Sequence, residues 1–207
     1  MPPVSQLPAA DARTLAAIRA ELASRVRYDD QSIVHERWIR QRYDCGCQES
    51  YAPARAAVVR TAWHEAGHAV AALAIGARFS SASIHHGPGR RDHASDGRVH
   101  GVAGGGELSF VVDAAGQIAE QLMSWTLLAG DAELRAWLPA WRRDGGDARR
   151  FRRAIQPRFG VDEVAAWRFC EELITSRRLP IRELSRALLV HDRHLTYNVA
   201  KELAGTP

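Results

Sequence analysis

Lysine is almost absent from this chain: Lys201 is the only lysine among its 28 basic residues. The formal net charge of +4 therefore comes from arginine. Together with the abundance of alanine, this bias indicates a GC-rich genome rather than a nucleic-acid ligand. One dense run of arginines has acidic residues within it, which favours a solvated helix face. The run comprises Arg142, Arg143, Arg149, Arg150, Arg152 and Arg153. We therefore expect no nucleic-acid partner.

Long apolar runs are also missing. The longest, AVAALAIGA at residues 69–77, is about half the length that spans a bilayer, so we expect no membrane span. The N-terminal segment has neither the basic start nor the apolar core of a signal peptide. The three cysteines, Cys45, Cys47 and Cys170, are too few and too unevenly placed for a disulfide framework. We therefore expect a cytoplasmic protein, in which Cys45 and Cys47 are free thiols rather than half of a structural zinc site.

Hydrophobic residues make up 46% of the chain and charged residues 25%, as in ordinary soluble globular proteins. Apolar residues recur at helical spacing along most of the sequence. We expect helices at 9–27, 32–43, 53–75, 107–128, 131–139, 146–156, 161–176, 180–190 and 196–204. Strand character is confined to 77–87 and 97–103, and a linker is indicated near 44–53. The pattern predicts a mainly α (α+β) fold, with an N-terminal helical extension over 1–52 and a second domain over 53–207.

The expected helix at 53–75 contains the segment TAWHEAGHAVAALAIG, residues 61–76. His64 and His68 are four residues apart, so they project from one face of a helix, one turn apart. Two imidazole nitrogens at this spacing bind one Zn²⁺ ion at about 2.0–2.1 Å each. Glu65 is placed to take a proton from water, as the general base does in the H-E-x-x-H metallopeptidase pattern. The alternative is an amphipathic helix whose histidines are only hydrogen-bonded.

A catalytic zinc site needs a third protein ligand and an open position for water. Sequence spacing alone does not choose among the candidates for that ligand. They are Glu107, Asp113, Glu120, Asp131, Glu133, Asp144 and Asp147, with His85, His86, His93 and His100 nearer in the sequence. The four histidines would stabilise an oxyanion or bind a second metal, but exposed loop histidines are the simpler interpretation. Trp63 either lines the site or packs in the core.

The segment TAWHEAGHAVAALAIGA resembles the zinc-binding helix of the FtsH family of proteases, whose signature is H-E-A-G-H-A. ASIHHG is similar to the edge strand that follows that helix, and DAAGQIAEQL to the family's G-G-R-A-A-E-E-L segment. LSRALLVHDRHLTYNVAKELAG resembles the last two helices. GGDARRFRRAI resembles the S-N-D-L-x-x-A-T segment, whose aspartate is the third zinc ligand, which implies Asp147. The resemblance covers roughly residues 55–205 and implies a helical zincin-like, FtsH-like peptidase domain that binds Zn²⁺.

Asp147 and Glu120 each have another interpretation. Asp147 lies in the first turn of an expected helix, where the helix dipole favours a carboxylate that would also serve as a cap. Glu120 is the alternative third ligand, or a partner that orients a ligating histidine. The chain also departs from the family, because it has no Walker-type motif and no membrane span. The two glycines and the arginine of the family's G-G-R segment correspond to Ala115, Gly116 and Gln117, a change that bears on substrate handling and oligomer contacts more than on metal binding.

These features predict a zinc-dependent metalloendopeptidase in which Glu65 is catalytic and His64, His68 and Asp147 hold the metal. Without an ATPase module of its own, it would cut unfolded or flexible proteins, or substrates delivered by a separate unfoldase or adaptor. The strand at SASIHH would bind an extended peptide by edge pairing. Two alternatives stay open: a metal-containing regulatory or binding module with little catalysis, and a motor-free protease that cuts one transcription factor. The sequence does not predict an oligomeric state.

Overall fold

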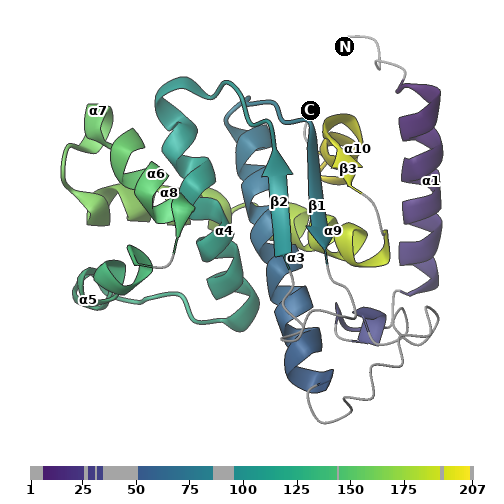
Figure 1. The fold of residues 1–207 in the computed structure, drawn as a ribbon, viewed down its shortest axis with the longest axis horizontal. Coiled ribbons are helices and arrows are strands. Elements are labelled where there is room, and N and C mark those ends of the chain that lie inside the picture. Colours follow the sequence, from purple (N-terminus) through teal and green to yellow (C-terminus); the bar gives the residue numbers. More distant parts are fainter. Residues whose placement is uncertain are drawn as a thin grey trace.

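The computed structural model describes residues 7–25, 28–30, 32–34, 51–85, 96–143, 145–191 and 194–205. These residues form a mainly helical fold with one small sheet, which confirms the expected fold class at that level (Figure 1). The principal helices are α1 (Ala9–Ser24), α3 (Tyr51–Ala74), α4 (Ser109–Ser124), α5 (Asp131–Trp141), α6 (Gly146–Ala154), α7 (Gln156–Phe159), α8 (Glu163–Thr175), α9 (Arg178–Val190) and α10 (Tyr197–Leu203). The strands are β1 (Ser81–His85), β2 (Asp96–His100) and β3 (Leu195–Thr196).

Helix α3 runs through the middle of the molecule, with α4 beside it (Figure 1). Both helices present small residues where they meet, so their backbones approach closely. A Cβ atom added to Gly67 of α3 would lie 2.5 Å from the carbonyl oxygen of Ala115 and 2.7 Å from Cβ of Ala119, both on α4. The close approach brings the polar side chains of α4 within reach of the histidines of α3.

The sheet lies against α3 and has the order β2-β1-β3. Strand β1 pairs antiparallel with β2 from Ser81 opposite His100 to His85 opposite Asp96. On its other side it pairs antiparallel with β3, Ser81 opposite Thr196. β1 is therefore the central strand and β2 an edge strand. The short β3 was not expected from the sequence, since two residues give no alternation to recognise.

Helices α5, α6 and α8 are held to α4 by aromatic packing. The ring of Trp167 meets Trp141 edge-on at a centroid distance of 4.9 Å and Phe151 at 6.2 Å. Phe151 in turn meets Phe110 of α4 at 6.2 Å. Phe110, Phe151 and Trp167 are fully buried. Such edge-to-face contacts add directional preference to the burial of large rings. They position α6, whose first turn carries Asp147, against α4.

The N-terminal part of the chain packs on the opposite side of the molecule from α5–α8 (Figure 1). In α1, the Asp11 carboxylate accepts hydrogen bonds from Thr196 Oγ1 and Asn198 Nδ2, each at 2.9 Å. The indole nitrogen of Trp63 donates to Asp30 Oδ2 at 3.1 Å, and the ring is 4% exposed. Of the two interpretations of Trp63, packing in the core is therefore correct. The proposed division of the chain at residue 52 stays a prediction.

Several element boundaries differ from those expected. The helix expected at 107–128 begins as a 3₁₀ turn (Gly106–Leu108) and ends at Ser124, because Trp125 has a left-handed φ of 57°. Of the helix expected at 32–43, only 32–34 is described, and it is helical. Residues 51–53 are helical too, so the linker was predicted to end too late; residues 44–50, with Cys45 and Cys47, lie outside the described ranges. None of the described helices combines the length and apolar character of a membrane span.

Candidate metal centre

The predicted site residues meet in an open cleft of about 1210 Å³. Helix α3 contributes His64, Glu65 and His68 to its lining, α4 contributes Glu120, and α6 contributes Asp147. The edge strand β2 and residues 102–104 complete the walls. Four elements distant in the sequence thus supply one polar surface. Glu65 and His68 are 6% and 7% exposed, so they lie at the bottom of the cleft.

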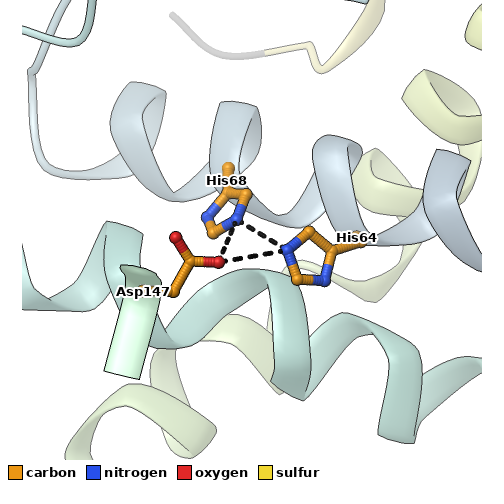
Figure 2. A group of neighbouring side chains, drawn as sticks. All are labelled: His64, His68 and Asp147. Carbon is orange, nitrogen blue, oxygen red and sulfur yellow. Dashed lines mark hydrogen bonds and ion pairs between the residues drawn. The ribbon is translucent and has the colours of Figure 1, made fainter. Parts of the chain in front are cut away.

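Three candidate ligand atoms face one another at the bottom of this cleft (Figure 2). The Nε2 atoms of His64 and His68 are 2.9 Å apart, and Asp147 Oδ2 lies 3.3 Å from the first and 3.4 Å from the second. A tetrahedral zinc ion bound at about 2.0–2.1 Å separates its ligand atoms by about 3.3 Å. The observed spacing is therefore close to that of a zinc site. Within the described ranges, this is the single group of metal-ligating type.

The remaining ring nitrogen of each histidine has its own acceptor. His64 Nδ1 lies 2.7 Å from Glu120 Oε1, and His68 Nδ1 lies 2.6 Å from the carbonyl oxygen of Val112. Both acceptors belong to α4. A carboxylate and a carbonyl each accept the Nδ1 proton, which directs the Nε2 lone pair of the neutral ring toward a metal. Glu120 therefore occupies the place of an orienting partner and not that of a third ligand.

Asp147 also forms an ion pair with Arg150, which in turn pairs with Asp113. Oδ1 of Asp147 accepts a hydrogen bond from Nη2 of Arg150, one turn further along α6. Nε of the same guanidinium donates to Asp113 Oδ1 on α4 at 2.7 Å. Both carboxylate oxygens of Asp147 thus contact side chains, Oδ1 that of Arg150 and Oδ2 those of the two histidines. Arg150 was not singled out in the sequence, where it lies among five similar arginines.

Two glycines leave room for the site. A Cβ atom at Gly116 of α4 would lie 2.6 Å from Nε2 of His64 and 2.6 Å from Nε2 of His68. It would fill the space in which the three ligand atoms converge. A Cβ atom at Gly97 of β2 would lie 2.5 Å from Cγ of Glu65. The edge strand therefore passes directly over the carboxylate predicted to act as the base.

In the absence of metal, the opposite charges of the site shift the pKa values of His64 and Asp147 in the direction that favours their charged forms. Burial, the largest influence, lowers the pKa of His64, but hydrogen bonds to Asp147 and Glu120 and the charges of Glu65 and Glu120 raise it to about 10. Burial raises the pKa of Asp147, whereas the hydrogen bonds and charges of His64 and His68 together outweigh it, so this pKa lies well below its ordinary value. Without metal, a proton on His64 faces an ionised Asp147 at neutral pH.

The other sequence candidates do not join the three ligand atoms. Asp113 lies nearby, but Arg150 binds its carboxylate. Glu107, Asp131 and Glu133 are exposed, and Asp131 pairs with Arg168. His85 and His100 lie at opposite ends of the β1–β2 ladder, so they do not form a second metal site together. His86, His93 and Asp144 lie outside the described residues.

The donor set fits a catalytic zinc ion. Two imidazole nitrogens and one carboxylate oxygen are the ligand types of such sites, and three protein ligands leave one position open. The cleft gives that position access from solvent.

Comparison with models of protein families, with curated proteins and with solved structures finds no match to this chain.

Proposed function

We propose that this chain is a zinc-dependent metalloendopeptidase. The observation that supports this most strongly is the convergence of His64 Nε2, His68 Nε2 and Asp147 Oδ2 at the bottom of an open cleft. The resemblance of the H-E-A-G-H-A segment to the zinc-binding helix of FtsH-family proteases supports the same conclusion. In that family the aspartate of the matching third segment is also a zinc ligand.

The chemistry divides between the metal and one carboxylate. Zn²⁺ in a site of this kind is a Lewis acid, which polarises a carbonyl group and makes water more acidic. Glu65 follows His64 on α3 and lines the cleft, so it is within the site but is not one of the three converging ligands. In the proposed reaction Glu65 takes the proton of the attacking water and passes it to the leaving amine. His64, His68 and Asp147 remain fixed during this transfer.

The sheet suggests how a peptide would enter the cleft. The sequence pointed to the strand at SASIHH as the edge for pairing, but this strand is β1, which is central. Strand β2 is the edge, and Gly97, Arg98 and Val99 line the cleft. An extended peptide that pairs with β2 would lie over Glu65. Edge pairing requires extended backbone, so substrates would be unfolded or flexible, or delivered by a separate unfoldase or adaptor.

The proposal is tested with purified protein, by measuring zinc content and hydrolysis of casein. The parent protein should contain about one zinc ion per chain and cleave casein. Glu65→Gln should keep the zinc and lower the cleavage rate by about 10²–10⁴-fold, because removal of a general acid–base costs that much. Glu172→Gln, an exposed change on α8, is the matched control and should leave the rate unchanged. A zinc-loaded parent protein that leaves casein intact would contradict the proposal.

A further inference from the structure

Arginines and acidic residues line the cleft in equal number, four of each. Its charged lining consists of Arg60, Arg98, Arg150, Arg153, Glu65, Asp113, Glu120 and Asp147. Arg150 pairs with both Asp113 and Asp147. Glu120 contacts His64 and lies 3.9 Å from Arg60. Asp113, Glu120 and Asp147 are thus engaged within the site, and a bound Zn²⁺ ion would add two positive charges to the cleft.

Two of these arginines stand apart from that network. Arg153 on α6 and Arg98 on β2 are exposed, and neither has an ion pair with a described residue. They belong to different walls of the cleft. Arg152, next to Arg153, faces elsewhere and pairs with Glu163 at 2.8 Å. Arg98 and Arg153 therefore line the cleft with charges that no described acidic residue neutralises, whereas the charge of Arg152 is paired within the fold.

Arg153 lies on the same helix as the candidate ligand Asp147, so the distance between them along α6 can be compared with the length of a bound peptide. Arg153 lies six residues after Asp147, which corresponds to about 9 Å along the helix axis. An extended peptide covers this distance in about three residues. A side chain two to four residues from the scissile bond would thus come within reach of Arg153. A guanidinium binds a carboxylate through two parallel hydrogen bonds, which makes the carboxylate its natural partner on a peptide.

We propose that the cleft selects peptides that carry an acidic side chain two to four residues from the bond to be cut, bound by Arg153 and assisted by Arg98. This inference rests on the proposed function, because it assigns the substrate class of that same site. Lysine or arginine at the same place would face two guanidinium groups and a metal ion. Charge complementarity of this kind controls partner choice more strongly than it controls total affinity.

Binding is measured separately from cleavage, on the full-length Glu65→Gln protein loaded with zinc. The probes are fluorescent ten-residue peptides of neutral background that carry one Glu, Gln or Lys at successive positions. At one position or two adjacent ones, we expect the Glu peptide to bind about three- to tenfold more tightly than the Gln peptide, and the Lys peptide to bind more weakly still. Adding Arg153→Gln should remove most of this preference, and Arg98→Gln a smaller part.

The matched control is Arg149→Gln, which removes the same charge from the same helix at a residue outside the cleft. It should leave the preference for Glu intact. Equal binding of Glu, Gln and Lys peptides, no binding of any peptide, or an equal loss in Arg149→Gln and Arg153→Gln would overturn the inference. Cleavage by the parent protein is followed in parallel. A preference for Glu without any cleavage would support the inference and contradict the peptidase function alone.

Discussion

Each candidate ligand is fixed through an atom that does not face the other two candidate ligands. His64 is held by Glu120, His68 by the carbonyl of Val112, and Asp147 by Arg150. A ligand held in its binding orientation loses little conformational freedom when metal arrives. We therefore expect the affinity of the proposed site for zinc to depend on residues that never touch the ion.

Glu120 offers the clearest test of this dependence. Glu120→Ala removes the acceptor of the His64 Nδ1 proton and should weaken zinc binding by about 10–100-fold. Glu120→Gln retains one oxygen acceptor and should weaken it less. Competition with a chelating indicator measures both affinities, with Glu172→Ala on α8 as the control for loss of an exposed glutamate. Unchanged affinity in Glu120→Ala would mean that His64 needs no partner.

At this scale the sequence predicts which candidate ligands lie together better than it predicts the residues that hold them. His64 and His68 follow from helical spacing, and the resemblance pointed to Asp147, whose carboxylate the structure places beside them. Arg150 could not be distinguished, because all the arginines of DARRFRR look alike until the fold assigns each a neighbour. Arg150 meets Asp113, 37 residues away, whereas Arg152 meets Glu163. Long-range pairing of this kind leaves no local pattern in the sequence.

Among the elements, α4 has a special position because it lies behind the candidate metal site without supplying one of its three converging atoms. Val112, Gly116 and Glu120 recur at four-residue intervals, so they share one face of the helix. That face supplies a carbonyl, an open space and a carboxylate to the two histidines. Its distance from α3 is set by the small residues between the two helices, Gly67 among them.

Gly67→Ala should therefore affect stability and metal binding together. The added Cβ would lie 2.5 Å from a backbone oxygen of α4, and overpacking of this kind costs about 1–3 kcal/mol. As α4 moves away, Glu120 and Val112 withdraw from the histidines and zinc affinity falls. Urea denaturation and zinc titration measure the two effects. Gly130→Ala, where a Cβ meets no atom within 4 Å, is the control and should change stability by about 0.5 kcal/mol or less.

The elements also differ in how well the sequence predicts them. Long periodic helices such as α3 and α8 were expected within a few residues of their observed bounds. Strand β3 was missed and was expected to begin a helix, because its pairing partner, β1, lies more than a hundred residues earlier. The end of α4 was missed because Trp125 adopts a left-handed φ that a tryptophan rarely takes.

For the whole molecule, the proposed zinc binding is linked to protonation. In the metal-free protein the pKa of His64 is about 10, so this residue carries a proton at pH 7. Zinc needs the neutral ring and must displace that proton. Because the pKa in the fold exceeds the ordinary value of about 6.5, the same proton stabilises the metal-free fold. This stabilisation is complete below about pH 6.5 and is lost as the pH rises toward 10.

Two measurements check this linkage. Calorimetric zinc titrations in buffers of different ionisation enthalpy should show the release of about one proton per ion at pH 7. The melting temperature of the chelator-treated protein should fall between pH 7 and 10, while an excess of zinc should raise it at each pH. Removing the metal should thus destabilise the protein most at high pH. Zinc binding without proton release would show that His64 is neutral in the metal-free protein.

The contact between Trp63 and Asp30 bears on what happens when the chain is shortened. Trp63 directly precedes the candidate ligand His64, and its indole N–H is buried against a carboxylate of the N-terminal segment. Arg186 of α9 donates to the backbone oxygens of Arg25 and Tyr28 in the same segment. A fragment beginning at residue 53 would leave both donors without these acceptors, on or beside the helix that carries the candidate ligands. Such a truncation would remove hydrogen bonds that hold the helix of the candidate metal centre in its place in the fold.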